Sequence, residues 1–258
     1  MHAIFAVIPI LTFQLEECRF HAPRETVLEV ATATRLLVNA GAGSLRVEGK
    51  PGLRQIRIRG IACASDRALL DEIELSAQRL GNDMRVLAND RDLELRNREY
   101  ARLNLIVEVP EGMAASINDG SGELELIALG TLDIIDGSGD ITIRDIDGSV
   151  QIEDRAGLIR LSAVRGDVNV DDTTGEIDLA DVIGTVDVRD GSGVVKLLRV
   201  GRHALISDGS GDIEIDGVGG DLTIRSDSNG GMDYRAVRGN VRVPLNRDYQ
   251  RYKLWPFR

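Results

Sequence analysis

The sequence has few of the residues from which compact catalytic and metal sites are usually built. It holds two cysteines, three histidines and one tryptophan in 258 residues, and aromatic residues make up 3%. Neither cysteine has a second ligand at zinc-site spacing. No apolar run approaches the roughly eighteen residues that a membrane-spanning helix needs. We therefore expect no metal centre, no cofactor and no transmembrane span.

The chain also lacks basic excess. It carries 42 acidic and 31 basic residues, a formal net charge of −11. Between Asn118 and Val243 acids outnumber bases roughly two to one, and the rest of the chain is close to neutral. Such a surface repels nucleic acid and anionic lipid headgroups. Nucleic-acid binding is therefore not expected.

What the sequence does contain is a period of nine residues marked by glycine. A fixed period is typical of a repeat protein, whose units bury their apolar faces only against their neighbours. The marking residues are Gly130, Gly139, Gly148, Gly157, Gly166, Gly175, Gly184 and Gly193, and again Gly211 and Gly220.

Each nine-residue unit has apolar residues at its second and fourth positions, as at Leu132 and Ile134. Alternation with a period of two predicts a strand, and the closing glycine allows a sharp corner. Every second unit adds an apolar residue two before the glycine, so the true repeat is eighteen residues. This residue is Ile146, Val164, Val182, Val200 or Val218.

The pattern predicts an all-β fold, a parallel β-solenoid with about 18 residues and two short strands per coil. An antiparallel meander is the alternative, because Asp-Gly and Ser-Gly pairs also form hairpin turns. A meander of such short strands would leave one apolar face bare, whereas a solenoid closes two sheets over a shared interior. We therefore favour the solenoid.

Four segments follow from the pattern. Residues 1–17 are interpreted as a signal or leader segment, although no basic residue precedes the apolar stretch and a buried first strand is the alternative. Residues 18–117 form an irregular start of the solenoid with one short helix, N-capped by Ser65. Residues 118–243 form the regular repeats, and 244–258 a C-terminal cap or tail.

Two residue sets lie at the ends of this arrangement. In an exported protein Cys18 and Cys63 are expected to form a structural disulfide; free buried thiols are the alternative. The C-terminal segment concentrates aromatic residues, which either fold back as a cap over the solenoid end or contact a partner. These residues are Tyr249, Tyr252, Trp255 and Phe257.

One acidic residue recurs at the polar corner of each coil. Stacked carboxylates repel one another, so each is expected to accept backbone N–H bonds from its own corner. Bound calcium is the alternative, but the calcium-binding nonapeptide pattern is not met. The column comprises Asp119, Asp136, Asp154, Asp172, Asp190 and Asp208.

No catalytic constellation stands out. The serines of Gly137-Ser138-Gly139 and its copies lack the Gly-x-Ser-x-Gly elbow, and the three histidines lie elsewhere. Asp187, Lys196 and Arg199 could converge on one outer face, as in β-helix enzymes that process acidic glycans. Processing of acidic glycans is therefore the alternative function. It is less favoured because the regular repeats leave little chain to build the wall of a substrate groove.

The segment from Leu103 to Gly112, with its Val-Pro-x-Gly end, precedes serial Ser-Gly-Asp-Ile turns at Ser138–Ile141 and Ser210–Ile213. Together these resemble a bacterial family of putative adhesins with β-strand repeats, sometimes called toastrack domains, over residues 25–243. The resemblance implies a β-solenoid of the periplasm or cell envelope without enzymatic activity. We expect an exported interaction scaffold or adhesin whose partner is a protein or an envelope glycan surface.

Overall fold

The computed structural model describes residues 18–89, 95 and 99–244. The expected leader, residues 1–17, lies outside this part of the chain. So do Tyr249, Tyr252, Trp255 and Phe257, the aromatic residues of the expected cap.

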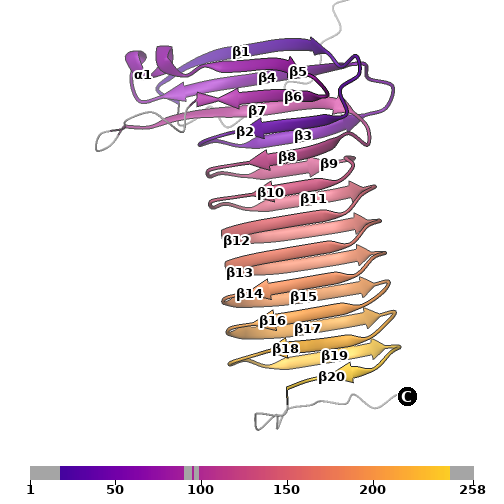
Figure 1. Ribbon diagram of the computed structural model, residues 1–258. Coiled ribbons are helices and arrows are strands. Elements are labelled where there is room, and N and C mark those ends of the chain that lie inside the picture. The colour runs from indigo at the N-terminus through magenta and orange to yellow at the C-terminus, as the bar shows by residue number, and fades with distance from the viewer. Residues whose placement is uncertain (1–17, 90–94, 96–98, 245–258) are drawn as a thin grey trace, which may run out of the picture.

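The chain winds into a long stack of coils, each contributing one strand to each of two ladders (Figure 1). We call the first ladder face A. Its strands in spatial order are β5 (Leu75–Leu80), β6 (Asp83–Ala88), β2 (Arg35–Asn39), β8 (Ala114–Asn118), β10 (Leu132–Ile135), the starts of β12 (Val150–Val164) and β13 (Val168–Val182), β14 (Val186–Asp190), β16 (Ala204–Asp208), β18 (Leu222–Ser226) and β20 (Val241–Arg242).

We call the second ladder face B. Strands β12 and β13 turn the polar corner without a break and pass from face A to face B. The order on face B is β1 (Phe20–Glu29), β4 (Gln55–Ala64), β7 (Ala101–Pro110), β3 (Leu45–Lys50), β9 (Leu124–Ile127), β11 (Ile141–Ile146), the ends of β12 and β13, β15 (Gly193–Val200), β17 (Gly211–Val218) and β19 (Met232–Val237).

Along the repeats the strands pair in parallel and in register. Val150 lies beside Val168, and Val168 beside Val186, one coil of 18 residues apart. The alternating apolar residues point into one continuous core between the two ladders. The predicted corner residues, from Ile146 to Val218, are at most 3% exposed and close the core at the apolar corner. The parallel β-solenoid is confirmed, and the antiparallel meander is excluded for the repeats.

The N-terminal end departs from this regularity. Strands β1 and β4, β4 and β7, and β5 and β6 pair antiparallel. The coil formed by β2 and β3 lies between β6 and β7 on one side and β8 and β9 on the other. The described chain therefore starts with β1 at the outer N-terminal end, enters the stack with β2 and β3, returns to the end with β4 to β7, and then continues into the repeats (Figure 1).

A six-residue helix, α1 (Arg67–Glu72), covers part of this end. Its N-cap is Asp66, whose Oδ1 accepts a hydrogen bond from the Leu69 N–H at 3.0 Å. The expectation of Ser65 was wrong by one residue, since both residue types can cap a helix and only the backbone geometry selects one. A disulfide joins Cys18 to Cys63, with Cα atoms 5.5 Å apart.

Glycines at the polar corner stack directly over one another. A Cβ built on Gly193 would lie 1.5 Å from the carbonyl oxygen of Gly175, and the φ angle of Gly193 is +154°. At such a distance no side chain fits. The closing glycine is thus required by the neighbouring coil as well as by its own corner.

Candidate functional site

The two-residue alternation of each face A strand continues into the polar corner and turns its aspartate inward. Leu132 and Ile134 point into the core, and Asp136 has the same parity. The six predicted aspartates are between 1% and 6% exposed, and they are the buried polar residues of the part of the chain that the structure describes. Their positions were predicted from the sequence. Their parity with the core residues of the same strand also indicates that they are buried.

The aspartates of successive coils are neighbours in the ladder. Asp154 lies beside Asp172, Asp172 beside Asp190, and Asp190 beside Asp208. Adjacent strands lie about 4.8 Å apart. Two full charges at that separation repel by roughly 3 kcal/mol at the effective dielectric constant of a protein surface.

A seventh aspartate, Asp227, continues the stack. The register shifts by one residue between Ile206 and Ser207, so its spacing from Asp208 is nineteen residues, which hid it from the eighteen-residue pattern. At the N-terminal end of face A, alanine occupies the position of the aspartate, at Ala40 and Ala88. We call the seven residues from Asp119 to Asp227 the aspartate column.

One carboxylate oxygen of each central member is used by its own corner. Backbone N–H groups donate to Oδ1 of Asp172, Asp190 and Asp208 from the residue two positions later, at 3.3, 3.2 and 3.1 Å. Oδ1 of Asp154 accepts from the next residue at 2.7 Å. Oδ2 of these four residues is buried and accepts no hydrogen bond within the described part of the chain.

Burial raises the pKa of these carboxyl groups, because the interior disfavours the charged form. The pKa of Asp190 rises to about 7, first through burial and then through the charges of Asp208 and Asp172. Burial, followed by a neighbouring carboxylate, raises the pKa of Asp172 and of Asp208 to about 6. Burial also raises the pKa of Asp154. The backbone hydrogen bonds act in the opposite direction and are outweighed.

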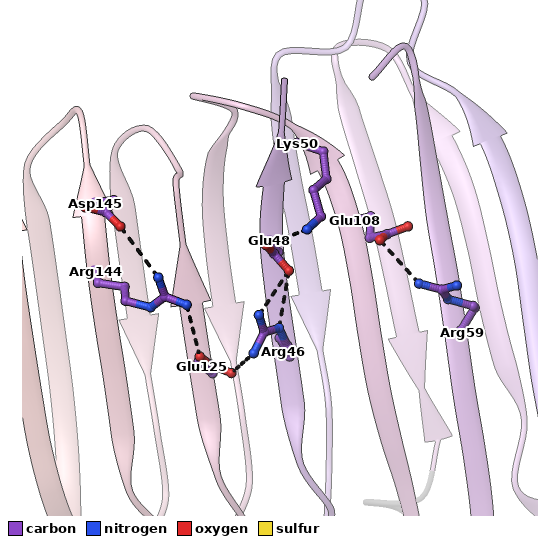
Figure 2. Close-up of polar contacts among 8 residues, drawn as sticks. All are labelled: Arg46, Glu48, Lys50, Arg59, Glu108, Glu125, Arg144 and Asp145. Atoms are coloured by element: carbon purple, nitrogen blue, oxygen red, sulfur yellow. Dashed lines mark hydrogen bonds and ion pairs between the residues drawn. The ribbon is translucent and has the colours of Figure 1, made fainter. Parts of the chain in front are cut away.

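The outward side of face B carries a network of ion pairs at its N-terminal end (Figure 2). Arg46 on β3 reaches both Glu48 on its own strand and Glu125 on β9. Burial by itself raises the pKa of Glu48, but hydrogen bonds from Lys50 and Arg46 outweigh it and hold the pKa below its usual range. Arg144 on β11 also pairs with Glu125 and so extends this network.

The expected convergence of Asp187, Lys196 and Arg199 is wrong. Asp187 lies on face A, where both of its carboxylate oxygens accept from Arg225 at 2.8 and 3.0 Å. Lys196 and Arg199 lie on face B and pair with acids one coil earlier in the sequence, Glu176 and Asp181. Three charged residues spaced along one coil fall on different faces because the coil turns between them.

The corner serines serve the backbone ladder. The carbonyl of Ser138 accepts from Gly122 N–H at 3.1 Å. His203, at the apolar corner, accepts a hydrogen bond from the Asp221 N–H at 3.0 Å. Across residues 18–89, 95 and 99–244, no group of three or more histidine, cysteine, aspartate or glutamate side chains is placed to hold a metal ion.

Within the described residues no helix has the length and apolar character needed to cross a membrane. No protein-family model matches the chain, and neither does any curated protein.

Solved structures do resemble the chain. A structure described as a putative adhesin from Bacteroides fragilis covers 87% of this chain and 97% of its own, with a TM-score of 0.51 and 11% identity. A putative cell adhesion protein from Clostridium sporogenes covers 86% of this chain and 98% of its own, with a TM-score of 0.36 and 14% identity. The description of the Bacteroides fragilis structure agrees with the sequence resemblance, and at this identity its likeness establishes a shared fold alone.

Proposed function

We propose that the protein is a non-enzymatic interaction scaffold of the cell envelope or periplasm, acting as an adhesin whose flat face A binds a protein surface. The observation that carries the proposal is a stripe of outward residues on face A whose acids have no ion-pair partner among the described residues. We call it the face A stripe. It comprises Asp133, Ile135, Gln151, Glu153, Asn169 and Asp171.

The stripe is formed by two neighbouring columns that the register holds together. Asp133 lies beside Gln151, and Ile135 beside Glu153. Glu153 in turn lies beside Asp171 in the next coil. All are exposed, and Ile135 is 49% exposed, a large value for an apolar side chain on a strand.

The contrast with face B supports a binding role for this stripe. On face B the acids Glu48, Glu108 and Glu125 are already engaged by arginine or lysine (Figure 2). Unpaired carboxylates, two amides and one exposed isoleucine suit a protein surface that offers basic groups around an apolar patch. The resemblance to adhesins agrees with such a role.

The test measures binding of the purified full chain to isolated bacterial envelopes. The triple variant Asp133→Asn, Glu153→Gln, Asp171→Asn should bind at least about tenfold more weakly, because three charge contacts are lost. Binding should also weaken as salt concentration rises. Protease treatment of the envelopes should abolish it, whereas binding that survives protease would indicate a glycan partner and contradict the proposal.

A variant with the same loss of charge on face B provides the control. Glu176→Gln, Asp178→Asn, Glu214→Gln should leave envelope binding within about twofold of the wild type, because these residues lie on the other ladder. Equal weakening by both triple variants would contradict a specific role of the face A stripe. Cleavage of envelope glycans by the wild-type chain would contradict a non-enzymatic function.

A further inference from the structure

We propose that the aspartate column holds protons shared between neighbouring carboxyl groups, and that the stability of the solenoid therefore responds to pH between mildly acidic and mildly basic conditions. The column is a separate feature from the face A stripe, since its side chains point into the core.

The geometry requires a donor that the surrounding chain does not supply. Oδ2 of Asp154, Asp172, Asp190 and Asp208 is buried without a hydrogen bond from the described residues. An ionised carboxylate can only accept, whereas a protonated one carries an O–H donor. In a stack with a strand spacing of about 4.8 Å, a proton on one carboxyl group provides the missing donor for its neighbour.

The charged groups acting on the column are carboxylates from every direction. Along the stack each member faces its neighbours, and Asp227 acts on Asp208. From the same strand Asp171 acts on Asp172, and from the start of β17, after the same corner, Asp212 acts on Asp208. The groups with the largest effects on the pKa values of Asp154, Asp172, Asp190 and Asp208 include no base.

Basic residues next to the column in sequence point away from it. Arg155 and Arg189 are exposed, whereas Asp154 and Asp190 beside them are buried. His203 lies five residues before Asp208, about 16 Å away along an extended strand, at the opposite corner. Protonation of the carboxyl groups themselves is therefore the available way to lower the repulsion.

The direction of the pH effect follows from the raised pKa values. In the unfolded chain these groups titrate near the ordinary aspartate value of about 4; in the folded chain Asp172, Asp190 and Asp208 titrate at about 6, 7 and 6. Between these limits the folded state binds more protons. The associated stability is fully present below about pH 4 and is lost as the pH rises through about 6 to 7.

The loss of stability at higher pH is expected to spread along the stack. Each coil of a solenoid is held only by its two neighbours, and the aspartate column runs through seven successive polar corners. Ionisation therefore places like charges at the same edge of every repeat. The three backbone N–H bonds to Oδ1 of Asp172, Asp190 and Asp208 remain, but they do not separate the charges.

The test is the thermal unfolding of the full chain at about pH 5 and about pH 8, compared with two variants. For the wild type we expect the Tm to be at least about 3 °C lower at the higher pH. Asp190→Asn removes a central charge and keeps the shape, so the difference between the two pH values should shrink by about a third or more. Asp133→Asn, an exposed aspartate on face A, is the control and should leave the difference unchanged.

A second measurement uses the unmodified chain and so does not depend on the folding of a variant. Infrared difference spectra should show the C=O stretch of protonated carboxyl groups at about pH 6, where ordinary aspartates and glutamates are ionised, and its loss by about pH 8, both on the folded protein. A Tm that is equal or higher at about pH 8 would overturn the proposal, as would the lack of this band. A rise in Tm of many degrees on adding calcium would assign the column to a cation instead of protons.

Discussion

Gly211 lies against the carbonyl oxygen of Gly193 one coil away, so closely that a Cβ on Gly211 would be 1.4 Å from that oxygen. On the same strand, β17, Gly217 also has a positive φ, +89°, but its nearest neighbours would be 3.5 Å or more from an added Cβ. The two glycines thus share a backbone requirement and differ in the space around them.

This difference predicts unequal effects of the same substitution. Gly211→Ala should lower the free energy of unfolding by about 3 kcal/mol or more, because backbone atoms of the next coil must move. Gly217→Ala should cost about 1 kcal/mol or less, since alanine tolerates this conformation at moderate cost and narrows the unfolded ensemble. Urea unfolding measures both, and similar losses for the two variants would contradict the steric explanation.

Much of the repeat region follows from local sequence, because in a solenoid the same local pattern recurs against itself. The alternation at Leu132 and Ile134 fixes which side chains are buried, and the nine-residue glycine period fixes the corners. The aspartate positions follow from the same count. Their burial also follows, once the parity of Asp136 with Ile134 is considered.

The N-terminal end could not be predicted in the same way. The alternation of apolar and polar residues is the same in parallel and antiparallel strands. The sequence of β4, Gln55–Ala64, therefore does not indicate that this strand is antiparallel to both of its neighbours. The placement of β2 and β3 inside the stack depends on pairings with strands more than forty residues later. Asp227 was missed because a bulge after Ile206 breaks the eighteen-residue spacing.

The disulfide offers a test of how far the ends of the solenoid are coupled. Cys18 and Cys63 close a loop with a sequence separation of 45, for which chain entropy predicts a stabilisation of about 4 kcal/mol. Because contacts in a solenoid are between neighbours, Cys18→Ala, Cys63→Ala should weaken hydrogen-exchange protection in β1 and β4. Protection in β13 should remain, and an equal loss there would show that the stack unfolds as one unit.

A second column of positive φ angles lies at the apolar corner and holds ordinary residues. Ala163 has a φ of +57°, a conformation that costs a non-glycine residue about 1 kcal/mol. Ala163→Gly should therefore stabilise the protein by about 0.5 kcal/mol after the greater freedom of unfolded glycine is included. Ala180→Gly, on β13 at an ordinary strand conformation, should instead destabilise it by about 1 kcal/mol. Chemical unfolding of the two variants should give opposite signs.

Arg24 joins β1 to the end of helix α1 and should contribute to closing the N-terminal end. Its Nε and Nη2 donate to the carbonyl oxygens of Ile73 and Leu70 at 2.9 and 3.0 Å. A planar guanidinium satisfies both carbonyls at once, whereas an ammonium group is a single compact donor. Arg24→Lys should therefore lower the unfolding free energy by about 1–2 kcal/mol. Arg57→Lys, an exposed arginine on β4, should change it by less than about 0.5 kcal/mol. If the two lysine variants unfold at the same urea concentration, the bonds from Arg24 do not contribute to closing this end.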